Sequence, residues 1–288
     1  MTSLSVLGVG KIGGEVAFLS AMSGLFDEMI IYDAATSFLQ SQVLDLLHTG
    51  IDITITTDPR QVKHTDICVF SAGLPRNEAV KTRADLLQAN LPVATECSSA
   101  LRNFEGVLIT VTNPMDANNY YLCRKIGLEP RQCIGFGGQL DSARFGLELT
   151  RHGIAGTPVV LGEHGEHQVP VFSTLGCGVP QTVKEEILSH LRGASMEVIK
   201  GKGGTVFGPS YHIAGLIRAV AEDRRAVIPC SCVLDGEYGL DCCSLGVPAR
   251  IGRSGILGIE EWKLDEWEED KFKKAGEFVR DLCKTITV

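Results

Sequence analysis

One histidine stands where acid–base chemistry is expected. His164 lies in the glycine-flanked segment 162–167 (Gly-Glu-His-Gly-Glu-His), directly after an apolar run, so we expect it at the exposed end of a strand rather than in a core. Histidine changes charge near neutral pH, which suits a general acid or base. His164 and His167 could instead ligate zinc, but the glycines oppose a helix and the sequence suggests no third ligand, so we expect no metal.

Two further clusters supply charge. Asp141 and Arg144 are three residues apart, so on a helix they share one face. Between residues 74 and 82 the apolar periodicity stops, and this polar segment carries Arg76 and Lys81 and runs into Arg83. It follows a predicted strand, and open α/β sheets bind ligands at the carboxyl ends of their strands. A surface ion pair and a solvated loop are the simpler alternatives for the two clusters.

A glycine motif near the start of the chain indicates a binding site for a ligand that contains phosphate groups. An apolar strand pattern breaks at Gly8, Gly10 and Gly13, spaced G-x-G-x-x-G, and helical spacing follows. These glycines permit a tight turn, room for a pyrophosphate against the backbone, and close packing of helix on strand. A second apolar strand ends at Asp33, twenty residues past Gly13, where an acid accepts from ribose hydroxyls. Together they favour a dinucleotide site over a structural glycine turn.

The expected cofactor is NAD rather than NADP. A 2′-phosphate needs a cation beside the ribose, and the sequence has no Lys or Arg between Lys11 and Arg60. Lys11 lies inside the glycine loop and is interpreted as a pyrophosphate or solvent contact.

The fold predicted around these residues is α/β. Strands and helices alternate in the doubly wound pattern of a Rossmann parallel sheet over residues 1–137, and an α+β substrate-binding and catalytic lobe follows over 138–288. Strands are predicted at 4–7, 29–32, 51–57, 67–73, 107–112, 133–136, 159–161, 169–172, 226–234 and 243–251. Helices are predicted after Gly10, at 38–47, at 83–103 with a kink at Pro92, up to about Gly127, and at 141–151, 183–199, 208–222 and 264–286.

Composition excludes several functional classes. The 288 residues are 44% hydrophobic and 22% charged, which is ordinary for a soluble protein. A net charge of −8 argues against nucleic-acid or anionic-membrane surfaces, because both need a basic face. The ten cysteines include no C-x-x-C pair and suggest reduced thiols in a cytoplasmic protein. No apolar run reaches membrane-spanning length, and the first strand leaves no room for a signal peptide.

Several motifs together resemble one family. Their order and approximate spacing are similar to those of the lactate and malate dehydrogenases, and most similar to the compact malate dehydrogenases of the lactate-dehydrogenase-like branch. The resemblance covers nearly the whole chain. It rests on the glycine loop, on residues 112–116 (Thr-Asn-Pro-Met-Asp), 140–144 (Leu-Asp-Ser-Ala-Arg) and 162–165 (Gly-Glu-His-Gly), and on 203–205 and 236–239.

The resemblance implies a role for each member of the polar clusters. His164 takes the hydroxyl proton as hydride leaves, Asp141 accepts from the other ring nitrogen, and Arg144 holds the substrate's C1 carboxylate in a bidentate fork. The other implied substrate contacts are Arg83, which polarises the forming carbonyl, Asn113 and Thr205. The expected cofactor contacts are Gly8, Gly10, Lys11, Ile12, Gly13, Asp33, Ala72, Gly73, Asn90, Val111 and Asn113.

Substrate choice is expected to depend on Arg76. The matching position is commonly Gln in lactate dehydrogenases and Arg in malate dehydrogenases, since only a dicarboxylate brings a second anion. A guanidinium facing the methyl group of pyruvate would stay unpaired, and unmet polar groups discriminate strongly. This loop departs from the family pattern, because it lacks a Pro-Gly hinge and has one more residue between Arg76 and Arg83, and Lys81 is a second candidate cation.

The resemblance therefore implies an NAD-dependent malate dehydrogenase that converts malate and NAD to oxaloacetate, NADH and a proton between two lobes. The alternatives are a lactate dehydrogenase or another 2-hydroxy-acid dehydrogenase of the family, an NAD- and metal-dependent glycosidase, and a catalytically silent NAD-binding protein. Relatives form homodimers or homotetramers, so a second copy of the chain is the expected partner, with the helix near 38–47 as a contact face.

Overall fold

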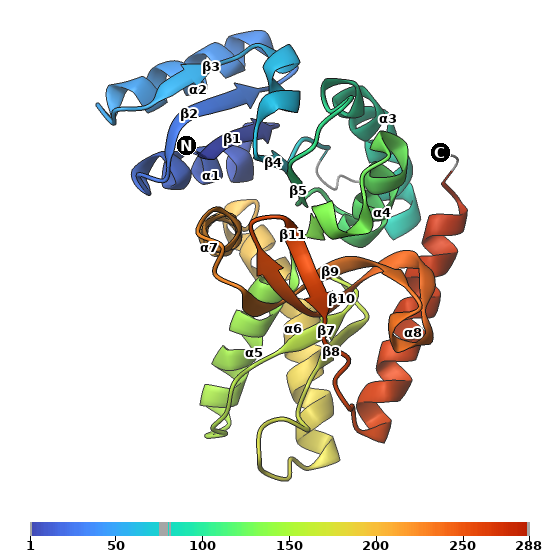
Figure 1. Cartoon of the computed structure of the whole chain (residues 1–288). Coiled ribbons are helices and arrows are strands. Elements are labelled where there is room, and N and C mark those ends of the chain that lie inside the picture. Colours follow the sequence, from blue (N-terminus) through green and yellow to red (C-terminus); the bar gives the residue numbers. More distant parts are fainter. Residues whose placement is uncertain (1, 75–79, 81, 287–288) are drawn as a thin grey trace.

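Two lobes make up the molecule (Figure 1). The computed structural model describes residues 2–74, 80 and 82–286, so Arg76 and Lys81 lie outside the described residues. The N-terminal lobe, blue to green, holds the parallel part of the sheet, and the C-terminal lobe, yellow-green to red, holds the antiparallel part (Figure 1). No helix among the described residues is long and apolar enough to cross a membrane.

Alternating strands and helices build the N-terminal lobe. Its parallel strands run in the order β3-β2-β1-β4-β5-β6, and the residues of β4 and β5 are buried throughout, as expected for strands covered on both faces. The elements are β1 (Thr2–Leu7), α1 (Lys11–Met22), β2 (Phe26–Tyr32), α2 (Thr36–His48), β3 (Thr54–Thr56), η1 (Pro59–His64), β4 (Ile67–Phe70), α3 (Arg83–Ala100), β5 (Val107–Thr110), α4 (Met115–Ile126), η2 (Pro130–Gln132) and β6 (Cys133–Gly135).

The C-terminal lobe combines long helices with an antiparallel sheet in the order β9-β10-β7-β8, and β11 adds to β10. Helix α8 carries an apolar stripe that is buried, including Phe272 and Val279, as the sequence predicts. The elements are α5 (Gly138–Arg151), β7 (Val160–Gly162), β8 (Gln168–Pro170), α6 (Gln181–Lys202), α7 (Phe207–Ala221), β9 (Ala226–Asp235), η3 (Glu237–Gly239), β10 (Asp241–Gly252), β11 (Gly255–Ile259) and α8 (Glu266–Lys284).

One hydrogen-bonded junction makes the two sheets continuous. Strand β6 pairs antiparallel with β9, with Ile134 opposite Cys232, so the last parallel strand is also the first neighbour of the second lobe. Helix α1 packs against α7, which brings the helix of the glycine motif onto the second lobe. One hydrophobic cluster extends through both lobes, from Val6 to Leu245. The lobes are therefore held in a fixed relation by backbone pairing and by a shared core.

The predicted fold class is confirmed, and three local differences have physical causes. Strand β3 is shorter than predicted because it is an edge strand that pairs only with β2. Strand β11 was not predicted, because its Gly-Ile-Leu-Gly-Ile sequence lacks clear alternation. Helix α2 does not bury the whole predicted stripe, since Phe38 and Leu47 are 44% and 51% exposed.

Candidate active site

Each glycine of the motif meets a different steric demand. Gly8 has a positive φ of +87°, and a Cβ there would collide with Ala72. A Cβ on Gly13 would collide with the carbonyl oxygen of Gly8, whereas one on Gly10 would meet nothing within 4 Å. Helix α1 begins beside Gly10 with no side-chain cap and no acid in its first turn. The start of α1 therefore has no side-chain cap and has room beside Gly10, as a bound pyrophosphate requires.

Asp33 fixes this loop from the end of β2. Its Oδ2 accepts from the Val9 N–H at 3.1 Å and its Oδ1 from the Ala35 N–H at 3.0 Å. Gln42 on α2 donates to the Val9 carbonyl at 2.6 Å. The predicted ribose acceptor thus lies against the glycine loop. Ile12, also a predicted contact, is half-buried in the core beneath it.

The loops after β4 and β5 carry the next predicted contacts. Thr112 Oγ1 donates to the Ala72 carbonyl at 2.7 Å, and a Cβ on Gly73 would collide with Thr112. Asn90 reaches this place from α3, where its amide bonds the backbone of Leu74 and donates to the Asn113 carbonyl at 2.9 Å. Asn90 is only 1% exposed and joins two loops in this structure. Val111 is partly buried beside them.

A histidine and a buried carboxylate form the centre of the site. His164 Nδ1 lies 2.7 Å from Asp141 Oδ2, and Asp141, on α5, is 2% exposed. Arg144, one helical turn further along α5, donates from Nη1 to Asp141 Oδ1 at 3.0 Å. The predicted helical face therefore exists, and it is directed at the loop after β7. The alternative of a simple surface ion pair is wrong, because Asp141 is buried and both His164 and Arg144 contact its carboxylate.

The charges around His164 favour its protonated form. Burial disfavours the imidazolium, but the Asp141 charge and hydrogen bond, with the charge of Asp116, outweigh burial and the opposing Arg83 charge. The pKa of His164 is therefore raised above its ordinary value. A histidine with a raised pKa beside a fixed carboxylate can take up and return a proton near neutral pH.

Arg83 connects three parts of the site. From the first position of α3, its Nη1 donates to Asn113 Oδ1 at 3.2 Å and its Nη2 donates to the His164 carbonyl at 2.9 Å. Its Nε lies 3.4 Å from Glu163 Oε1. The helix start is fixed by a reciprocal capping box between Thr82 and Asp85. Three predicted residues from separate elements, Arg83, Asn113 and His164, are thus brought together.

Glu163 is a member of the site that the sequence analysis did not single out. It is 3% exposed, and its Oε2 accepts from the His167 N–H at 2.9 Å. Burial alone would raise its pKa, but the hydrogen bonds from His167 and the Arg83 charge lower the pKa to about 2. The signal in the sequence that could have identified Glu163 was its position directly before the candidate catalytic histidine, His164.

Two glycines leave space that these side chains occupy. A Cβ on Gly137 would lie 2.5 Å from the Cγ of His164, and one on Gly165 would collide with Arg83 and Glu163. Gly137 immediately precedes α5, which carries Asp141. The close approach of the histidine ring to the backbone therefore depends on the absence of a side chain there.

Thr205 lies between α6 and α7 and is half-buried. Lys11 Nζ donates to the Gly203 carbonyl at 3.3 Å, so the segment that carries Thr205 lies beside the glycine loop. Lys11 thereby has a contact within the chain that the sequence did not predict.

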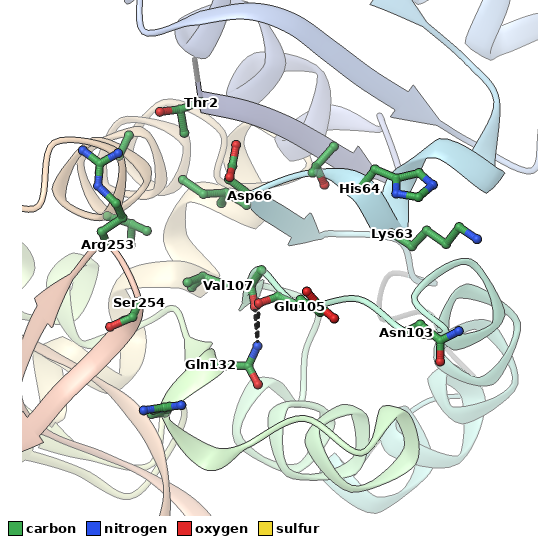
Figure 2. A pocket seen from close by; sticks show the side chains of 16 residues that line it. Thr2, Lys63, His64, Asp66, Asn103, Glu105, Val107, Gln132, Arg253 and Ser254 are labelled. Atoms are coloured by element: carbon green, nitrogen blue, oxygen red, sulfur yellow. Dashed lines mark hydrogen bonds between the residues drawn. The ribbon is translucent and has the colours of Figure 1, made fainter.

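A cavity lies at the opposite edge of the sheet. Its volume is about 720 Å³, and it is lined by residues such as Asp66, Glu105 and Arg253 at the amino ends of β4 and β5 and at the β10–β11 turn. Figure 2 shows these side chains around the opening, with Gln132 bonded to the adjacent backbone. Among the described residues its lining does not include His164, so this cavity is separate from the candidate site. No group of three potential metal ligands occurs in residues 2–74, 80 and 82–286.

Comparisons with known proteins match both lobes. The family model described as lactate/malate dehydrogenase, NAD binding domain, matches residues 2–135, and the one described as lactate/malate dehydrogenase, alpha/beta C-terminal domain, matches residues 139–287. A malate dehydrogenase of Haloferax volcanii is 36% identical, with 99% of this chain and 100% of that protein covered.

Solved structures agree with these matches. The malate dehydrogenase of Archaeoglobus fulgidus in complex with NADH has a TM-score of 0.90 at 30% identity, with 99% of each chain covered. The minor L-lactate dehydrogenase of Enterococcus mundtii has a TM-score of 0.92 at 21% identity, covering 100% of this chain and 99% of that one, and shows a shared fold.

Gly137→Ala is expected to disturb the His164–Asp141 pair. The added methyl group pushes the ring away, so the pKa of His164 falls back toward its ordinary value, and overpacking lowers the free energy of unfolding by about 1–3 kcal/mol. NMR titration of ¹³C-labelled histidine and urea denaturation measure the two effects. Gly193→Ala, inside α6 with nothing within 4 Å of the added Cβ, is the control: it leaves the His164 titration unchanged and raises the free energy of unfolding by about 0.5–1 kcal/mol, because alanine is the better helix former. An unchanged His164 titration in Gly137→Ala would contradict the proposed contact.

Proposed function

The chain belongs to the lactate/malate dehydrogenase family, and we propose that within this family it is an NAD-dependent malate dehydrogenase. As a member it is an NAD-dependent 2-hydroxy-acid dehydrogenase with an NAD-binding N-terminal domain. The observation that carries the catalytic assignment is the 2.7 Å contact between His164 Nδ1 and the buried Asp141 carboxylate. Full-length similarity to a protein named malate dehydrogenase supports the choice of substrate.

The proposed proton acceptor is His164 Nε2. Because Asp141 can only accept, the neutral ring carries its proton on Nδ1 and leaves the Nε2 lone pair free. That nitrogen takes the hydroxyl proton of malate, and Asp141 stabilises the imidazolium that results. In the reverse direction the imidazolium returns the proton to the carbonyl oxygen of oxaloacetate. Bound NAD supplies the acceptor for the hydride.

Arginines orient the substrate in this proposal. Arg144 uses one of its five N–H donors on Asp141, so the others remain for a bidentate contact with the C1 carboxylate. Arg83, held by Asn113 and the His164 carbonyl, polarises the carbonyl group as it forms. Asn113 shares that position, and Thr205 lines the substrate pocket. Arg76, outside the described residues, pairs with the second carboxylate of malate.

The glycine loop and its neighbours are the proposed NAD contacts. Open space beside Gly10 and the uncapped start of α1 support pyrophosphate binding there, and the half-buried Asp33 carboxylate supports a ribose contact. Lys11, Ile12, Gly13 and Gly8 complete the loop. The loops after β4 and β5 contribute Ala72, Gly73, Asn90, Val111 and Asn113.

The domain boundary, the partner and the compartment are also proposals. We place the boundary between residues 137 and 138, supported by the start of α5 at Gly138. A homodimer or homotetramer is supported by apolar side chains on α2, where Phe38, Leu44 and Leu47 are 44%, 54% and 51% exposed. A cytoplasmic location is supported by all ten cysteines being free.

Replacing His164 by Ala tests the catalytic assignment. Loss of the general base and acid lowers kcat for oxaloacetate reduction by about 10²- to 10⁴-fold, while NADH affinity, measured by fluorescence titration, stays near wild type. His64→Ala, an exposed histidine at the opposite-edge cavity, is the control and keeps full activity. A His164→Ala enzyme with half of the wild-type kcat would refute the assignment.

The raised pKa of His164 predicts opposite pH profiles for the two directions. Oxaloacetate reduction needs the imidazolium, so its kcat/KM stays high above pH 6.5, the ordinary value, and declines only as pH rises through the raised pKa. Malate oxidation needs the neutral ring, so its kcat/KM increases over the same interval. Steady-state rates at 340 nm from pH 5 to 10 provide the measurement. A decline in reduction already below pH 6.5 would contradict the raised pKa.

Arg76→Gln tests the substrate assignment. Removing the cation that pairs with the second carboxylate lowers kcat/KM for oxaloacetate by about 10²- to 10⁴-fold. It does not lower kcat/KM for pyruvate, because no unpaired guanidinium then faces the methyl group. Parallel NADH oxidation assays with both substrates measure the difference. Lys81→Gln, at the second candidate cation of the same loop, is assayed beside it, and it keeps the wild-type preference for oxaloacetate if Arg76 is the selector. Equal losses for oxaloacetate and pyruvate would exclude Arg76 as the selector and favour a broader 2-hydroxy-acid dehydrogenase.

A further inference from the structure

A second buried carboxylate contacts the loop of His164. Asp116, in the first turn of α4, is 3% exposed, and its Oδ2 accepts from the His164 backbone N–H at 2.9 Å. Its Oδ1 accepts from Ser231 Oγ, on β9, at 2.6 Å. The positive end of α4 and both donors favour the ionised form. The mechanism derived above does not use this group.

Donor directions show that a whole chain of hydrogen bonds ends on Asp116. Asn119 Nδ2 can only donate, and it does so to Ser244 Oγ at 2.9 Å. The Ser244 hydroxyl is then free to donate to Ser231 Oγ, 2.8 Å away, and Ser231 donates to Asp116. All three donors are 1% exposed or less. Each bond polarises the next, so the network supports a negative charge at its end.

Charged and titratable groups surround both His164 and Asp116. Facing His164 are Asp141 from α5, Asp116 from α4 and Arg83 from α3. Near Asp116 are Glu163 from the His164 loop, and the thiols of Cys243 on β10 and Cys283 on α8. The two carboxylates therefore act on His164 from two different helices, against the guanidinium of Arg83.

Asp116 can lose or gain its proton in a useful pH range. Burial, and then the Glu163 charge, raise the pKa of Asp116 to about 6, against the hydrogen bonds from Ser231 and the His164 N–H. Its charge is among those that raise the pKa of His164. The state of Asp116 therefore affects how firmly His164 holds a proton near neutral pH.

We propose that Asp116 is a positioning residue of the reaction, which holds the His164 backbone and favours the imidazolium through its negative charge. The proposal rests on the proposed function, because it assumes that His164 exchanges a proton with the substrate. Asp116 acts through His164 and does not itself touch the substrate. The Ser231–Ser244–Asn119 chain is the structure that keeps it ionised.

Asp116→Asn, compared with Ser244→Ala, tests the proposal. Asn keeps the shape but removes the charge, so the pKa of His164 falls, as read from NMR of ¹³C-labelled histidine in the ligand-free protein. Oxaloacetate reduction then loses roughly three- to tenfold in kcat/KM at pH 8.5 and much less at pH 6. Ser244→Ala breaks the chain one bond away from Asp116 and leaves both hydrogen bonds of Asp116 in place, so it lowers the urea midpoint but shifts the His164 titration far less than Asp116→Asn does.

Ser231→Ala keeps the test valid if Asp116→Asn does not fold. Losing the Ser231 donor raises the pKa of Asp116, so His164 shifts in the same direction by a smaller step. An unchanged His164 titration in the folded Asp116→Asn protein, or in Ser231→Ala where Asp116→Asn does not fold, would overturn the proposal and leave the network a structural one. Failure of the proposed function would be distinguishable: the wild-type protein would then not turn over oxaloacetate, whereas the effect of Asp116→Asn on the His164 titration of the ligand-free protein could still be measured.

Discussion

The structure depends on the compensation of buried charge at one place. Asp141 and Glu163 are almost fully withdrawn from water, and an isolated carboxylate there would cost several kcal/mol or would become protonated. Each has a cationic or hydrogen-bonding partner instead: His164 and Arg144 for Asp141, and Arg83 and His167 for Glu163. Because His164 reaches Asp141 from the loop after β7, and Arg83 reaches Glu163 from α3, these charges tie α3, α5 and that loop together.

The continuous sheet explains how those parts reach one point. The glycine loop, the loops after β4 and β5, and α3 all follow the carboxyl ends of parallel strands, which lie along one edge of a sheet. The antiparallel pairing of β6 with β9 then carries the second lobe onto this edge, and β7 delivers His164 from that side. The glycine loop and His164 therefore belong to different lobes but to one hydrogen-bonded framework.

Local spacing predicted what depends on local geometry. The three glycines follow from their G-x-G-x-x-G spacing, the strand that ends at Asp33 from its apolar run, and the shared face of Asp141 and Arg144 from the helical period of 3.6 residues. Long-range partners left no such signal. Ser231 and Ser244 stand in strands that read as apolar runs, and only the pairing of β9 with β10 and the packing of α4 bring them to Asp116. The ion pair of Glu163 likewise could not be recognised from the sequence, because its partner Arg83 lies eighty residues earlier in the chain.

The arginines illustrate why such partners matter for catalysis. A free guanidinium loses considerable side-chain entropy when a substrate immobilises it, about 2 kcal/mol for a long cationic side chain. Arg83 is held at three points by Asn113, the His164 carbonyl and Glu163, and Arg144 is held by Asp141, so this entropy is already lost on folding. In the proposed mechanism the substrate therefore meets donors in fixed directions, and the binding free energy is available for orienting the reacting atoms. The buried acids, whose desolvation opposes folding, therefore also hold the arginines in place before substrate binds.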